Sequence, residues 1–123
     1  MIRLRRPLLS VFAAAAAVTS LFFINLCGTI FRCGCVSLWS GADAHCNIHL
    51  AGSRHCPWCV HGQVASAIPW ALIVAAQAAI SFWPRPMHAG VHTVVRLMAA
   101  LAAFPAAGTL IALAYGLSVA YCR

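Results

Sequence analysis

The chain has 123 residues, of which 63% are hydrophobic and only 7% are charged, a composition outside the range of ordinary soluble domains. Its net charge of +7 comes from eight arginines against one acidic residue, and their scattered positions argue against a nucleic-acid partner. Because Asp43 is the only acidic side chain, chemistry that needs paired carboxylates is excluded. The composition predicts a protein that resides in a lipid bilayer.

The first apolar segment, residues 7–31, follows a basic N-terminus, residues 1–6, and carries no charged side chain. At 1.5 Å per residue this segment is long enough to cross a bilayer with some tilt. A cleaved signal peptide is the alternative, since residues 15–17 are three alanines that offer a cleavage site. The apolar run continues well beyond them, so we expect a retained anchor.

Two further apolar segments, residues 64–83 and 91–121, flank a short cytoplasmic turn at residues 84–90. We expect Pro69 in the first turn of the second helix, where proline loses no intrahelical hydrogen bond. Pro105 predicts a kink in the third helix. The predicted fold is therefore an all-α integral membrane protein with three transmembrane helices and an extramembrane loop between the first and second.

The arginines fall on two sides of such a protein, and cytoplasmic flanks are usually the richer in basic residues. One side has Arg3, Arg5, Arg6, Arg85 and Arg96, and the other has Arg32, Arg54 and Arg123. This bias predicts a bacterial inner-membrane protein with a cytoplasmic N-terminus and the loop outside, where disulfides can persist.

Each apolar segment contains an alanine-rich stretch, at residues 13–17, 75–79 and 99–107. Membrane helices associate through close backbone approach at small residues, so we expect these faces to pack on one another. The alternative is docking on other membrane subunits or in a homo-oligomer. We also expect Asn25 and Gln77 to form hydrogen bonds between helices, because an unpaired amide in hydrocarbon is costly.

The loop, residues 32–63, is rich in cysteine and histidine. A segment this short cannot bury a core of its own, so a fixed shape needs a metal, disulfides or a partner. The C-x-x-H and C-x-x-C spacings suit metal binding, because a tight turn directs two side chains at one ion. The predicted tetrahedral ligands are Cys46, His49, Cys56 and Cys59.

Four further residues of the loop belong to the same site or an adjoining one: Cys33, Cys35, His55 and His61. Zinc is the expected metal, with copper or an iron–sulfur cluster as alternatives, because thiolates and imidazoles suit each of them. A catalytic zinc site usually adds a carboxylate or a water network, and Asp43 is the only carboxylate. The sequence therefore favours a metal-binding accessory subunit or metal-handling protein over an enzyme.

Thiol–disulfide chemistry is the main alternative. Cys56-Pro57-Trp58-Cys59 resembles the C-P-x-C active-site core of glutaredoxin-like proteins, and adjacent His55 would stabilise a thiolate. Together with membrane helices, this motif looks like the plan of quinone-linked membrane oxidoreductases of the disulfide-forming and vitamin K epoxide reductase types. Those proteins are four-helix bundles, whereas this chain supplies three spans. A third interpretation is a loop held by structural disulfides, which accounts for the cysteines but gives no reason for the histidines.

Overall fold

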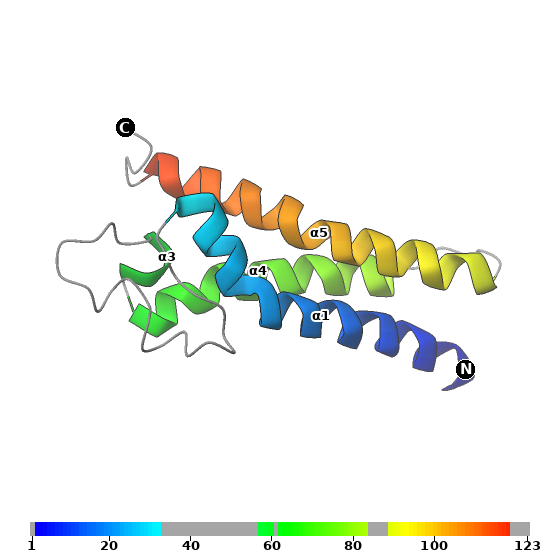
Figure 1. The fold of residues 1–123 in the computed structure, drawn as a ribbon. Helices are drawn as coiled ribbons and strands as arrows, with labels where there is room; N and C mark the ends of the chain where they lie inside the picture. Colours follow the sequence, from blue (N-terminus) through cyan, green and yellow to red (C-terminus); the bar gives the residue numbers. More distant parts are fainter. Residues whose placement is uncertain (1, 33–56, 61, 84–88, 119–123) are drawn as a thin grey trace.

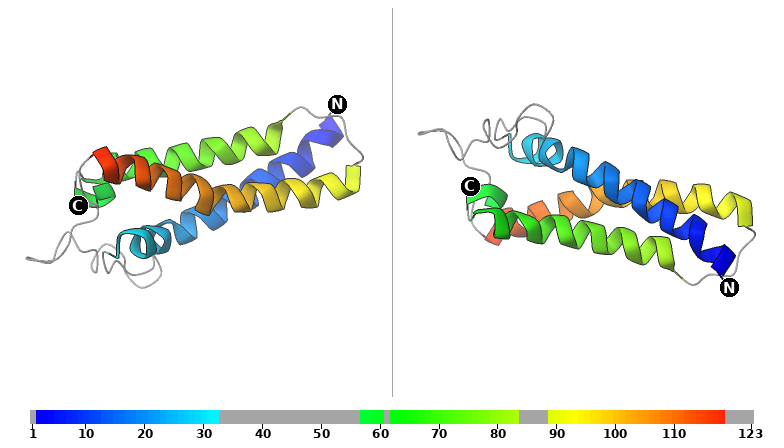
Figure 2. Two further views of the ribbon diagram at one scale, coloured as in Figure 1. Left: turned by 90° about the horizontal axis from the view of Figure 1, so that it is seen from above. Right: turned by 90° about the horizontal axis from the view of Figure 1, so that it is seen from below.

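The computed structural model describes residues 2–32, 57–60, 62–83 and 89–118, and all regular structure in these residues is helical. The helices are α1 (Ile2–Phe31), α3 (Pro57–Val60), α4 (Gly62–Phe82) and α5 (Ala89–Ser118). The three long helices pack against one another in an up-down-up bundle, as Figures 1 and 2 show. The predicted all-α class is confirmed.

The antiparallel order gives the bundle two distinct ends. At the end that we call the α3 end, the last turn of α1, the short helix α3, the first turn of α4 and the last turn of α5 lie together (Figure 1). The opposite end contains the start of α1, the end of α4 and the start of α5. The bundle therefore places the chain on either side of residues 33–56 at the α3 end.

Two of the helices are long and apolar enough to cross a membrane by length and composition. Their apolar segments are Pro7–Phe31 in α1 and Thr93–Gly116 in α5. The apolar part of α4 is shorter, at Ala67–Phe82. The structure thus supports two potential membrane spans on these criteria.

The boundaries of α1 differ from the predicted segment at one end only. The helix begins at Ile2 and includes the basic residues that the sequence assigned to a separate N-terminus, so Pro7 lies inside it. It ends at Phe31 as predicted, and Arg32 follows with a positive φ of 49°. A left-handed residue directly after the last helical one is a common helix terminator.

The expectation for Pro69 is wrong. The second long helix begins at Gly62, so Pro69 lies about two turns inside it, where no N–H is available to donate to the carbonyl of Ala65. The apolar run marked only part of this helix, because its first turn contains polar residues. The third long helix, α5, continues unbroken through Pro105. Figure 2 shows the axis of this helix changing direction near its middle.

Small residues let the three helices approach closely, as the alanine-rich stretches predicted. Ala15 of α1 and Ala100 of α5 are fully buried. A β-carbon at Gly108 of α5 would collide with the side chain of Leu26 in α1 and would contact Ile73 in α4. Gly108 therefore marks a point where all three long helices meet.

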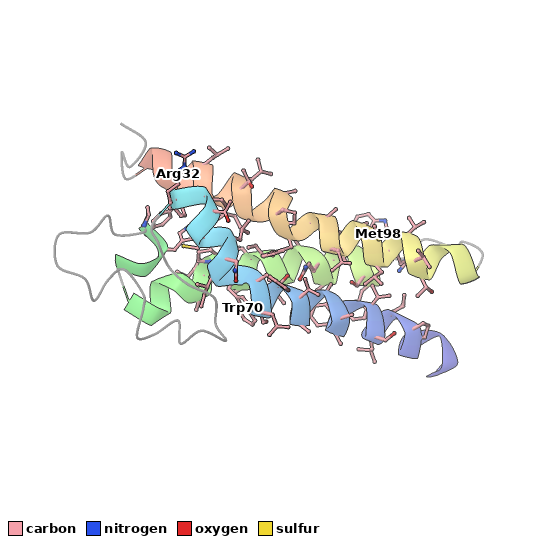
Figure 3. The ribbon with its side chains drawn as sticks, in the orientation of Figure 1. Arg32, Trp70 and Met98 are labelled. Carbon is pink, nitrogen blue, oxygen red and sulfur yellow. The ribbon has the colours of Figure 1, made fainter. Side chains whose placement is uncertain are left out.

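The outer surface of the bundle is apolar, unlike that of a water-soluble protein, and a few polar side chains are buried inside. The buried polar residues among those described are Thr19, Gln77 and Ser81, each with no exposed surface. Large apolar side chains cover the outside, and Met98, 61% exposed, lies on the outer side of α5 in Figure 3. The other exposed ones are Leu9, Leu21, Phe22, Ile68, Trp70, Leu72, Phe82, Trp83, Val94, Val95, Leu110 and Leu113. A lipid environment suits such a surface.

Candidate functional site

Most of the predicted metal ligands lie outside the described residues: Cys33, Cys35, Cys46, His49, His55, Cys56 and His61. Cys59 lies in α3, where the structure describes the backbone. Among the side chains that the structure does describe, no three His, Cys, Asp or Glu residues gather at one point. The eight-residue ligand set stays a prediction.

The tryptophan of the C-P-W-C motif fixes α3 to the bundle. Trp58 is 1% exposed and stacks on Phe23 of α1, with ring centroids 5.3 Å apart and planes only 6° from parallel. Its edge also meets Phe31, with centroids 5.3 Å apart and planes at 75°. Offset-stacked and edge-to-face pairs each contribute about 0.5–1.5 kcal/mol beyond the area that they bury. Trp58 therefore ties the segment that carries Cys59 to the last two turns of α1.

A cysteine outside the loop belongs to the same hydrophobic cluster. Cys27 of α1 and Ala112 of α5 are buried with Trp58, and Tyr115 packs against this cluster from α5. The cluster thus joins α1, α3 and α5 at the α3 end of the bundle. It places Trp58, the residue before Cys59, in one buried cluster with Cys27.

Arg32 is the first residue beyond this cluster. It is exposed and lies at the α3 end, beside the last turns of α5 in Figure 3. The side of a membrane on which this end lies stays a prediction.

Polar contacts tie the helices together in the middle of the bundle. The amide nitrogen of Gln77 in α4 donates to Thr19 Oγ1 in α1 at 2.8 Å and to the carbonyl oxygen of Ala100 in α5 at 3.0 Å. One side chain therefore bonds to both neighbouring helices. The prediction that Gln77 hydrogen-bonds across helices is confirmed.

A second set of contacts lies one turn nearer the opposite end. The guanidinium of Arg96 in α5 donates to the carbonyl oxygens of Ser81 at 2.9 Å and Trp83 at 2.8 Å. These carbonyls lie at the C-terminus of α4, where no intrahelical donor remains for them and the helix dipole favours a cation. Arg96 therefore caps α4 while belonging to α5.

Two contacts that involve aromatic side chains also join α1 and α4. The indole N–H of Trp70 donates to Ser20 Oγ at 3.2 Å, and Figure 3 shows Trp70 at the side of α4 that faces α1. Phe12 and Phe82 meet near the opposite end, with ring centroids 5.7 Å apart. For Asn25, the described contact is at its backbone, where its carbonyl oxygen accepts from Thr29 Oγ1 at 2.8 Å.

The sequence pattern does not identify Trp58 as the residue that attaches α3 to α1. A tryptophan between two cysteines is a visible signal, but its partners Phe23 and Phe31 lie more than 25 residues earlier in an apolar run. The interior role of Thr19 and Ser81 was also missed. Isolated hydroxyl residues within apolar segments are the signal that points to them, and Ser81 in addition lies four residues after Gln77.

Comparison with known proteins finds no match: no family model fits the chain, and no curated protein or solved structure is significantly similar to it.

Proposed function

We propose that the chain is a small integral membrane protein of three transmembrane helices, which binds a transition metal, zinc in the first place, through residues 32–63. The membrane assignment is supported by the apolar outer surface of the bundle, combined with the burial of the polar side chains Thr19, Gln77 and Ser81. The third span would be α4. Its 21 residues correspond to about 30 Å of helix, the thickness of the hydrocarbon core of a bilayer.

The main support for the metal proposal is the packing of α3 against α1. A C-x-x-C pair holds an ion well when the turn between its cysteines has a fixed shape. Trp58, between Cys56 and Cys59, is buried against Phe23 and Phe31. The proposal is that this packing would hold the turn between Cys56 and Cys59, and that Cys46 and His49 would complete the tetrahedron from the preceding part of the loop.

The biological role would be that of an accessory subunit in a membrane complex, whose surface the metal stabilises, or metal handling at the outer face. Exposed alanines next to large apolar residues, for example Ala99 beside Met98, offer close approach to a further membrane helix. The N-terminus would be cytoplasmic and the loop outside.

Thiol–disulfide exchange is the second candidate, and the position of Cys27 favours it. Cys27 and Trp58 belong to one buried cluster, so a third cysteine lies near the C-P-W-C motif. A disulfide between Cys56 and Cys59 would oxidise a substrate dithiol to a disulfide and would itself be reduced to two thiols. Structural disulfides remain the third interpretation.

The deciding experiment is elemental analysis of the detergent-purified chain, combined with a count of free thiols after denaturation without reductant. The metal proposal predicts about one equivalent of zinc, copper or iron, and thiols that react once the metal is removed. Cys59→Ser should lose the metal, whereas Cys27→Ala, which changes a cysteine outside the ligand set, should retain it. A metal-free protein whose loop cysteines are oxidised overturns the proposal. The reduction potential of the C-P-W-C pair then separates redox chemistry from inert bridges.

The orientation is tested separately with fusions at the C-terminus. The proposal predicts that alkaline phosphatase fused there is active outside the cytoplasm, and that a green fluorescent protein fused there by the same route stays dark. The reverse pattern overturns the orientation and leaves the metal result unaffected.

A further inference from the structure

Two polar oxygen atoms inside the bundle have no hydrogen-bond partner in the protein. They are the amide oxygen of Gln77 and the hydroxyl of Ser81, and both side chains are fully buried. Nearly all buried polar groups in proteins are satisfied by a protein group or an ordered water, since leaving one unpaired costs about 1–3 kcal/mol. Two such atoms on one helix therefore point to a ligand.

The amide of Gln77 cannot satisfy its oxygen by turning over. Its nitrogen donates to Ala100 O, a carbonyl oxygen that only accepts. In the reversed orientation the two oxygens would face each other. The contact with Ala100 thus fixes the orientation of the amide and leaves its oxygen in need of a donor.

The two residues are neighbours on one face of α4. Gln77 and Ser81 are four residues apart, a spacing at which side chains on a helix can interact. A small molecule with two hydrogen bonds of about 2.8 Å each can bridge such neighbours. A buried water needs two to four polar partners, and these two oxygens supply the minimum.

We propose that the bundle binds one water molecule between these side chains, as a donor to the Gln77 amide oxygen and a partner of the Ser81 hydroxyl. The water would complete a polar strip on α4 that also includes the contacts of Gln77 with Thr19 and Ala100. This site is separate from the Cys/His loop and does not depend on the metal proposal.

The polar contacts of α4 continue toward the opposite end of the bundle. Arg96 bonds to the carbonyl oxygen of Ser81 and is partly exposed. The neighbouring Trp83, whose carbonyl oxygen also accepts from Arg96, is 56% exposed. Arg96 therefore extends the polar contacts of α4 from the backbone of Ser81 to a partly exposed side chain.

The first test uses nuclear magnetic resonance on the full chain with ¹⁵N-labelled glutamine, in detergent micelles. The sequence contains two glutamines, Gln63 and Gln77, so Gln77→Leu identifies the signals of the buried amide. The proposal predicts cross-relaxation between the Gln77 side-chain protons and water, which disappears in Ser81→Ala while the two hydrogen-bonded amide protons keep their shifts.

The second test is the sign of the stability change in Ser81→Ala. If water bridges the pair, the substitution leaves the amide oxygen of Gln77 unpaired, and the equilibrium constant for unfolding should rise about five- to tenfold. If no water is bound, the substitution removes an unsatisfied hydroxyl, and the constant should fall. Ser10→Ala is the matched control, because Ser10 is exposed and bonds to Pro7 O within its own helix.

The outcomes separate the alternatives. Water contact together with the loss of stability in Ser81→Ala supports the site. Loss of stability without any water contact at the Gln77 amide shows a direct Ser81–Gln77 hydrogen bond and overturns the proposal. Increased stability in Ser81→Ala overturns it as well.

Discussion

The indole ring of Trp58 lies parallel to the ring of Phe23, 35 positions earlier in the chain, at a centroid separation of 5.3 Å. This contact brings the C-P-W-C motif onto the last turns of α1. Trp58 is also buried against Phe31, so α3 is attached to the bundle through this side chain. The chemistry of its cysteines, whether with metal or disulfide, would take place next to packed helices.

Removing the Trp58 ring should release α3 from the bundle and uncover Cys27. Trp58→Ala deletes a buried aromatic side chain at a cost of about 3–5 kcal/mol, whereas Trp58→Phe keeps a ring on Phe23. We expect alkylation of Cys27, measured by peptide mass spectrometry in the presence of a reductant, to be at least about tenfold faster in Trp58→Ala than in the wild type. Trp83→Ala changes an exposed tryptophan and should leave the rate unchanged. Equal rates in all variants would show that Trp58 does not cover Cys27.

Gln77 should stabilise the bundle through both of its hydrogen bonds. Gln77→Leu keeps the size of the side chain but loses the contacts with Thr19 and Ala100. Hydrogen bonds between membrane helices average about 0.6 kcal/mol and reach about 1.7 kcal/mol, so we expect a loss of roughly 1 kcal/mol. The measurement is reversible unfolding in mixed detergent, followed by circular dichroism. Thr109→Val, an exposed change on α5, is the control, and a variant as stable as the wild type would refute the role of Gln77.

Gly108 should tolerate a methyl group only if Leu26 is shortened. In Gly108→Ala, the new β-carbon collides with the Leu26 side chain. Overpacking of this kind costs about 1–3 kcal/mol, which exceeds the gain of about 0.8–1 kcal/mol in helix propensity. In a Leu26→Ala background the same change should become stabilising. Ala102→Leu, on the exposed side of α5, controls for added volume. A Gly108→Ala effect of the same sign in both backgrounds contradicts close packing at this point.

Replacing Arg32 by glycine should stabilise the protein. The positive φ of 49° at Arg32 is a left-handed backbone conformation, which costs about 1–2 kcal/mol for residues other than glycine. We expect Arg32→Gly to raise the unfolding free energy by about 1 kcal/mol. Arg32→Ala removes the same charge and retains the β-carbon, so it should bring no such gain. Equal effects of the two substitutions would mean that the charge, and not the backbone, decides.

The predicted boundaries of α1 and α4 agree with the structure to different degrees. The apolar segment 7–31 and α1 end at the same residue, Phe31. An apolar run that is followed by polar residues has a sharp boundary in the sequence. The start of α4 was missed, since residues 62–66 are helical without belonging to the apolar run. Hydropathy reports where lipid contact begins, whereas the helix continues for as long as its backbone hydrogen bonds do.

Composition and the spacing of apolar residues were enough to determine an all-helical protein with bilayer-length segments, a polar bond from Gln77 and close packing at alanines. These features follow from local hydrophobicity and from the cost of an unpaired amide in an apolar environment. Tertiary structure alone decided that Trp58 binds α3 to α1, that Gly108 lies where three helices meet, and that Gln77 and Ser81 leave two buried oxygens unpaired. Each of these depends on side chains from distant segments meeting at one point, and no local pattern specifies which of many apolar or small residues will face one another.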